Sequence, residues 1–279
     1  MISDKRFVNQ PLEFWANVKL ISQRVGYTER STSKIKIPAQ IEIEKAYKNL
    51  GLDSSKLFHS GGKLTRFGNK IIAYFEHRAN CLNKEVEPNL MNREQAEKLF
   101  YELLHEFNPK NPPPLNKQKG DKRTPAFFTG IVNTLIEANI FGHECDFNPK
   151  WLTSFTHKSF PVRTLSRQID GAFPNTVNPI AIWEIKEYYN TTTFGSRVAD
   201  GVYETLLDGY ELNEARKYLN RDISHYLMVD DYFTWWVKGK SYLCRICDMV
   251  HMGLLTEAIF GREVVKRLPV IAKEWVAKI

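Results

Sequence analysis

The chain has 279 residues, a formal net charge of +7 and a hydrophobic fraction of 43%, which suffices for one large or two small packed domains. The moderate positive charge favours a polyanionic partner such as nucleic acid. The sequence has no run of about 18 apolar residues and no signal-peptide hydrophobic region at its start. We therefore expect a soluble, cytoplasmic protein with no membrane partner.

The first third of the chain is predicted to be largely helical. Apolar residues recur at helical spacing in three segments, residues 11–25, 38–50 and 67–82. Asn92, followed three residues later by Gln95, predicts a capping box at the start of a further helix that ends at Phe107. We interpret residues 1–107 as a helical N-terminal region that would aid DNA recognition or the formation of a homodimer.

Residues 108–123 contain three consecutive prolines, a glycine and several basic residues, a composition that cannot form a packed element. We interpret this segment as a basic, proline-rich linker or surface loop. Four of its basic side chains are candidates to contact DNA phosphates, namely Lys117, Lys119, Lys122 and Arg123. The alternative is a solvated connector that binds nothing.

Residues 124–279 are predicted to form an α/β domain with C-terminal helices. The expected elements are a helix over residues 125–142, a hairpin over 168–188, a helix over 196–218, a buried parallel strand over 225–229 and two helices within 240–279. Ser196 is the predicted N-cap of the middle helix, and Leu207 is expected on its apolar side. This order predicts a mixed central sheet flanked by helices.

The hairpin carries the residues of most chemical interest. Asp170 precedes the second strand, on which Glu184 and Lys186 stand two apart, so that their side chains point to the same face. Ile182 shares that face, which puts these charges at the end of a partly buried row, where unpaired charges are costly. Two carboxylates and one ammonium on adjacent strands form a site for a divalent metal ion and a water nucleophile, the chemistry of phosphodiester hydrolysis.

This D…ExK arrangement resembles the PD-(D/E)xK nuclease superfamily, which includes many type II restriction endonucleases. The resemblance covers under half of the chain, and Ile169 stands where the family often has proline. It implies a restriction-endonuclease-like core in which Asp170 and Glu184 ligate Mg²⁺ and Lys186 orients the attacking water or stabilises developing charge. The family's first core helix commonly supplies one more acidic residue, and Glu137 matches that residue by position.

The resemblance therefore implies a Mg²⁺-dependent endonuclease that hydrolyses double-stranded DNA, of the type II restriction or another anti-phage defence kind. The alternative is a non-catalytic nucleic-acid-binding or scaffold protein in which the D…ExK pattern is accidental, since a Glu-x-Lys pair on a strand is often a surface ion pair.

Several other residues invite a functional interpretation. Arg163 and Arg167 could touch phosphate, Asp230-Asp231 could bind a metal ion, and Trp235-Trp236 could stack on nucleic acid. Ordinary surface charge, solvated strand ends and core packing are the alternatives for each of these features.

A zinc site is a further alternative. Its candidate ligands are His143, Cys145, Cys244 and Cys247. Cys244 and Cys247, however, belong to a predicted apolar helix, where helical spacing alone puts them on one face. Buried structural cysteines are the commoner outcome in such helices.

Overall fold

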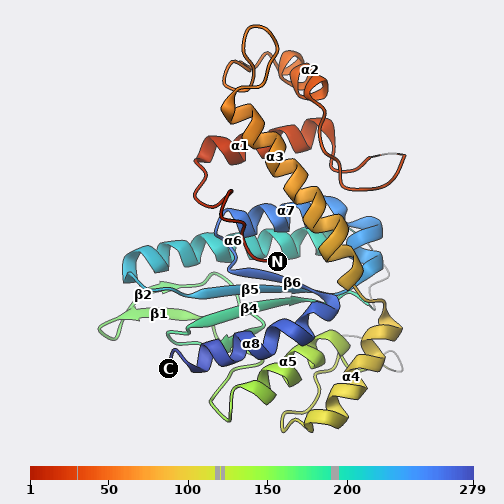
Figure 1. The fold of residues 1–279 in the computed structure, drawn as a ribbon. Coiled ribbons are helices and arrows are strands. Elements are labelled where there is room, and N and C mark those ends of the chain that lie inside the picture. The colour runs from red at the N-terminus through yellow and green to blue at the C-terminus, as the bar shows by residue number, and fades with distance from the viewer. Residues whose placement is uncertain (30, 117–119, 121–122, 190–194) are drawn as a thin grey trace.

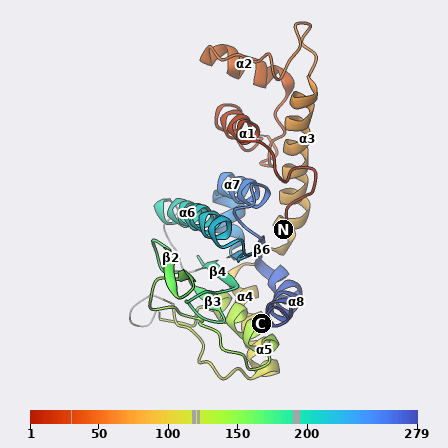
Figure 2. The ribbon, with the colours of Figure 1, turned by 90° about the vertical axis from the view of Figure 1, so that its left-hand side faces the viewer.

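The computed structural model describes residues 1–279 except residues 30, 117–119, 121–122 and 190–194. A four-stranded sheet lies between two layers of helices, and a helical N-terminal region stands on the outer side of one layer (Figures 1 and 2). This arrangement confirms the predicted mixed α/β class and the helical start of the chain. Within the described residues, no helix is long and apolar enough to cross a membrane.

The N-terminal region is built from α1 (Leu12–Val25), α2 (Gln40–Leu50) and α3 (Arg66–Asn80). Aromatic side chains dominate its core, with Phe14 and Tyr74 fully buried. The short helices η1 (Cys81–Val86) and η2 (Glu87–Asn89) then lead the chain down to the sheet.

One face of the sheet is covered by α4 (Arg93–Phe107), α5 (Phe127–Asn139) and α8 (Val264–Val276), and we call it the α5 face. The predicted capping box of α4 is confirmed, because Asn92 Oδ1 accepts from the Gln95 amide at 2.8 Å and Gln95 Oε1 accepts from the Asn92 amide at 3.0 Å. Phe100 of α4 packs against Gly130 of α5, so α4 shares its core with the sheet and not with the three helices before it.

The sheet has the strand order β3 (Gly171–Phe173), β4 (Ala181–Lys186), β5 (Ser224–Val229) and β6 (Glu257–Phe260). β3 is antiparallel to β4, whereas β4, β5 and β6 run parallel. The predicted hairpin and parallel strand are therefore confirmed. The expectation of helices alone after residue 240 was wrong, because β6 lies between α7 (Lys240–His251) and α8. A four-residue strand that is buried on both faces leaves no periodic pattern to detect.

A separate antiparallel hairpin, β1 (Ser154–His157) and β2 (Phe160–Thr164), lies beside the four-stranded sheet. The long helix α6 (Ser196–Leu219) makes the crossover from β4 to β5, as predicted. Its cap differs from the prediction, because Gly195 occupies the N-cap position without a side-chain bond and Ser196 is the first helical residue. Leu207 is also exposed, so it does not belong to the buried side of the helix.

α6 and α7 cover the second face of the sheet, which we call the α6 face. Alternation along the strands assigns each side chain to one face. On β5, the Met228 side chain points to the α5 face and the Leu227 side chain points to the α6 face. On β4, the side chains of Trp183 and Ile185 point to the α5 face. Glu184 stands between them and therefore points to the other face, toward α6.

Candidate functional site

Glu184 and Lys186 lie at the end of β4, inside the layer between the sheet and α6. Glu184 is fully buried and Lys186 is 9% exposed. The Lys186 ammonium donates to Glu184 Oε2 at 2.9 Å, so the two predicted residues form an ion pair. Gly201 of α6 makes room for this lysine, because a Cβ atom there would stand 3.1 Å from Lys186 Cδ and Cε.

Asp170 meets this pair from the other strand of the hairpin. Its Oδ2 atom accepts from the Ile185 amide at 2.7 Å, and its carboxyl is close enough to Glu184 and Lys186 for their charges to shift its pKa. Gly171 allows this turn into β3, because a Cβ atom there would stand 2.1 Å from the indole of Trp183 on β4. The structure therefore brings Asp170, Glu184 and Lys186 together.

Arg167 is the residue that completes this cluster. Its guanidinium donates to both carboxylate oxygens of Glu184, at 2.8 and 3.1 Å, and to Asp208 Oδ2 of α6 at 2.6 Å. The sequence marked Arg167 as a possible phosphate contact, whereas in the structure it is paired with carboxylates. Arg163 is likewise paired, with Glu211 at 2.8 Å.

α6 supplies two carboxylates that the sequence did not single out. Glu204 lies 3.2 Å from the Lys186 ammonium and 3.4 Å from the Arg167 guanidinium, and it is half-buried. Asp208 is fully buried, and its Oδ1 atom has no hydrogen-bond partner among the residues that the structure describes. We call Arg167, Asp170, Glu184, Lys186, Glu204 and Asp208 the Arg167 network.

The Arg167 network holds four carboxylates against two cations, an excess of negative charge. Burial opposes the ionisation of Glu184, but the charges of Lys186 and Arg167 outweigh it and lower its pKa. The pKa of Lys186 is raised, because Glu184 and Asp170 outweigh its burial. Both cations are therefore charged at neutral pH.

The two aspartates of the network have raised pKa values. The atoms packed around Asp170 and the neighbouring negative charge of Glu184 raise the pKa of Asp170 to about 7, although the residue itself is exposed to solvent. Burial raises the pKa of Asp208 to about 7 despite its bond to Arg167. Carboxyls that hold their protons so strongly indicate a place where added positive charge is favourable.

The donor chemistry at Asp170 and Glu184 fits a hard divalent cation such as Mg²⁺, which prefers carboxylate oxygens. In the part of the chain that is described, no group of three or more His, Cys, Asp or Glu side chains is arranged to hold a metal ion. Both oxygens of Glu184 also accept from Arg167. A cation could therefore reach Glu184 only after the Arg167 guanidinium moves aside.

The structure does not bring Glu137 to this cluster. Glu137 lies near the end of α5, on the opposite face of the sheet, and accepts from the amides of Lys110 and Asn111 at 2.6 and 3.3 Å. Its carboxylate therefore fixes the loop after α4. On the same side of the sheet, Glu187 accepts from the amide and hydroxyl of Thr129 and so caps the start of α5.

The predicted DNA contacts in the basic segment lie mostly outside the described residues, which exclude Lys117, Lys119 and Lys122. Arg123 is described and is exposed.

The predicted zinc ligands do not form one site. Cys145 packs against the core of the α5 face, whereas Cys244 and Cys247 are buried in the core of the α6 face. His143 is exposed in the turn after α5. The sheet therefore separates the two halves of the candidate site, and the cysteines act as small core residues.

Asp230 and the two tryptophans are also structural. The Asp230 carboxylate is buried and accepts from the Tyr188 amide and from the indole N–H of Trp235, at 2.5 and 3.1 Å. Asp231 caps η4 (Tyr232–Lys238) through the Thr234 amide. Trp235 and Trp236 are 0% and 5% exposed, so neither can stack on nucleic acid in this conformation.

Comparison with known proteins divides the chain into two segments. Residues 1–85 match the family described as "Domain of unknown function (DUF7690)", and residues 91–275 match the family described as "Domain of unknown function (DUF7687)". No curated protein and no solved structure matches the chain. Since the second match spans more than half of the chain, the protein belongs to the DUF7687 family.

Proposed function

We propose that the protein is a Mg²⁺-dependent endonuclease that hydrolyses phosphodiester bonds of double-stranded DNA, of the type II restriction or another anti-phage defence kind. The observation that carries this proposal is the convergence of Asp170, Glu184 and Lys186 at one end of β4, with an excess of carboxylates around them. The D…ExK resemblance assigns catalytic roles to these same three residues.

The order of elements around the site supports a restriction-endonuclease-like core. A helix, α5, precedes the β3–β4 hairpin, and a second helix, α6, leads to a strand, β5, that is parallel to β4. This is the order that the PD-(D/E)xK resemblance implies. The site lies at the carboxyl end of β4, the edge of a parallel sheet where ligands commonly bind.

In this proposal Asp170 and Glu184 hold the Mg²⁺ ion, which when bound neutralises phosphate charge and lowers the pKa of a water molecule. The chain's own contribution is position and charge. The Asp170 carboxylate is fixed by the Ile185 amide, and the Lys186 ammonium is held beside Glu184 and remains charged. A fixed ammonium at this place orients a water molecule or stabilises negative charge on the phosphate.

We assign Arg167 two roles in the same proposal. In the described conformation it neutralises Glu184 and Asp208 and so holds the carboxylates together without a metal ion. With a cation held at Glu184, the Arg167 guanidinium would be free to act as a bidentate donor for a phosphate group. This movement reconciles the observed pairing with the phosphate contact that the sequence favoured for Arg167.

The second candidate function is a non-catalytic nucleic-acid-binding or scaffold protein. One observation favours it, namely that Glu184 and Lys186 are already paired with each other and with Arg167. Charges that satisfy one another can serve the fold alone, without a metal ion or a substrate.

Nicking of supercoiled plasmid DNA by the pure protein separates the two functions. We expect Mg²⁺-dependent nicking that EDTA abolishes. Lys186→Ala and Asp170→Ala should each reduce the rate by at least about 100-fold, the usual effect of removing a group that stabilises transition-state charge. Lys150→Ala, at an exposed lysine outside the Arg167 network, is the matched control and should cleave normally.

Thermal unfolding of each variant would show that lost cleavage is not lost folding. A near wild-type rate for Lys186→Ala would remove the catalytic role of that residue. Absence of nicking by the wild-type protein, together with binding of duplex DNA at low salt, would favour the non-catalytic function.

The proposed DNA partner has its own test. Phosphate contacts release counterions, so the logarithm of affinity should fall with the logarithm of salt concentration by about 0.9 per phosphate neutralised. Neutralising Lys117, Lys119, Lys122 and Arg123 together should flatten this slope if the basic segment lies on DNA. An unchanged slope would make the segment a simple linker and leave the catalytic proposal intact.

A further inference from the structure

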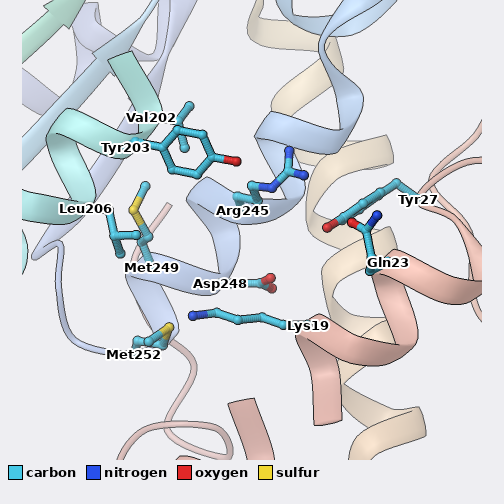
Figure 3. A pocket seen from close by; sticks show the side chains of 10 residues that line it. All are labelled: Lys19, Gln23, Tyr27, Val202, Tyr203, Leu206, Arg245, Asp248, Met249 and Met252. Atoms are coloured by element: carbon cyan, nitrogen blue, oxygen red, sulfur yellow. The ribbon is translucent and has the colours of Figure 1, made fainter. Parts of the chain in front are cut away.

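A pocket of about 330 Å³ lies between the N-terminal region and the helices of the α6 face (Figure 3). α1 and the residue Tyr27 form one wall, and α6 and α7 form the other. Residues from both family-matched segments therefore line it. Its volume is in the range of small-molecule sites, which commonly lie between domains.

Two cations reach this pocket, one from each wall. Lys19 extends from α1 toward α7, and Arg245 projects from α7 (Figure 3). Among the described residues, neither side chain has an ion pair with a carboxylate. The Arg245 guanidinium instead lies over the ring of Tyr27, with 5.1 Å between its central carbon and the ring centroid.

The carboxylate in the pocket is already neutralised. Asp248 accepts from the Tyr74 hydroxyl at 2.6 Å and from the Arg78 guanidinium at 3.2 Å, and all three residues are buried. Asp248 and Arg78 cancel each other, so Lys19 and Arg245 leave the pocket with two uncompensated positive charges. A pocket with this positive charge favours an anionic ligand.

Apart from Gln23, the rest of the lining is apolar, aromatic or sulfur-containing. Leu206 of α6 and Met249 and Met252 of α7 line the wall opposite α1. Methionine side chains adapt to flat rings and make favourable sulfur–aromatic contacts. The phenol ring of Tyr203 extends toward Arg245 in Figure 3, so that an apolar surface lies beside the cationic group.

We propose that this pocket binds a small aromatic anion, a planar ring system that carries a phosphate, sulfonate or carboxylate group. The ring lies against Leu206 and Met249, and the anionic group lies between Lys19 and Arg245. Because these residues come from both segments, the ligand links the N-terminal region to the sheet domain. The site is separate from the Arg167 network, which lies on the sheet side of α6, so this proposal does not depend on nuclease activity.

The test compares two dyes by isothermal titration calorimetry of the full chain. The anionic probe is 8-anilinonaphthalene-1-sulfonate, and the neutral probe is N-phenyl-1-naphthylamine, which has the same ring system without the sulfonate. We expect the anionic dye to bind at one site per chain, and we expect Arg245→Gln to weaken it at least tenfold. The same substitution should change binding of the neutral dye less than twofold.

Two further variants assign this binding to the pocket. Leu206→Trp fills the cavity and should weaken both dyes, whereas Leu207→Trp, at the adjacent exposed position of α6, should weaken neither. Arg262→Gln, at an exposed arginine that does not line the pocket, is the charge control. No single-site binding of the anionic dye, or equal losses of both dyes in Arg245→Gln, would overturn the proposal.

Discussion

Two arginine networks among the described residues, centred on Arg78 and Arg167, differ in charge balance and in access to solvent. In the Arg78 network, formed by Ser22, Tyr74, Arg78 and Asp248, one arginine meets one carboxylate, and every member is buried. In the Arg167 network two cations meet four carboxylates, Asp170 is exposed and Glu204 is half-buried.

This difference separates a structural role from a binding role. The Arg78 network joins α3 to α7 and is closed, since its charges cancel and its members are shielded from water. The Arg167 network is open on one side and has fewer cations than carboxylates, and burial together with the negative charge of Glu184 raises the pKa values of Asp170 and Asp208. A buried charge pair alone is therefore weak evidence for function, whereas an unbalanced and accessible cluster is the better candidate for a binding site.

Breaking the closed network should have the largest effect. Asp248→Ala would leave Arg78 buried without a carboxylate, and we expect the free energy of unfolding to fall by about 3–5 kcal/mol. Urea denaturation measures this loss. The double variant Arg78→Met/Asp248→Leu should recover most of it, since it removes both charges together. A loss in the double variant equal to that in Asp248→Ala would show that packing, and not charge balance, stabilises this contact.

Removing the central arginine of the open network should have a smaller and cation-dependent effect. Arg167→Met leaves Glu184 and Asp208 with less positive charge, so we expect a loss of about 2–3 kcal/mol without divalent ions. Millimolar Mg²⁺ should restore part of this loss, because the ion replaces the guanidinium at Glu184. Arg78→Met is the matched control, and Mg²⁺ should not rescue it. Equal responses of both variants to Mg²⁺ would remove the distinction between the two networks.

The pH dependence of stability should report the raised pKa of Asp170. The folded protein keeps this proton up to about pH 7, whereas an unfolded aspartate loses it near pH 4. The unfolded state therefore binds fewer protons in this window, and the residue destabilises the fold increasingly as pH rises from about 4 to 7. Asp170→Asn should remove this cost, with a gain on the order of 1 kcal/mol above pH 7, because solvent screens the exposed group.

Asp53→Asn is the control of opposite sign. The Ser55 amide and hydroxyl donate to Asp53 and lower its pKa. The stability that Asp53 contributes is therefore present above about pH 4 and is lost as pH falls through its folded pKa. Thermal unfolding from about pH 2 to pH 8 measures both variants. A gain in Asp170→Asn that does not grow with pH would contradict the proposed charge excess.

The sequence was sufficient to predict the part of the site that depends on local periodicity. Glu184 and Lys186 share a face because strand side chains alternate, and the hairpin brings Asp170 beside them. Asp208 could not be placed in the same way, since its contact with Arg167 depends on how α6 is rotated over β4. An acidic residue among the buried positions of α6 was the available signal.

The same limit explains the misplaced candidate on α5. The resemblance assigned an acidic residue to the first core helix, and Glu137 is the only carboxylate there, but sequence position does not fix which way a helix faces. In the structure α5 packs against the sheet through Phe128 and Ile131, and Glu137 lies beside the preceding loop.

Glu137→Ala should therefore have the smallest effect of all. The substitution removes the acceptor for the Lys110 and Asn111 amides, so we expect a loss of about 1 kcal/mol in unfolding free energy and a cleavage rate within about twofold of wild type. Glu137→Gln keeps an acceptor oxygen and should recover part of the stability. Plasmid nicking and urea denaturation measure the two effects separately. If Glu137→Ala reduced cleavage as strongly as Asp170→Ala, α5 would have to reach the site in the active conformation, and the Arg167 network would not be the whole catalytic centre.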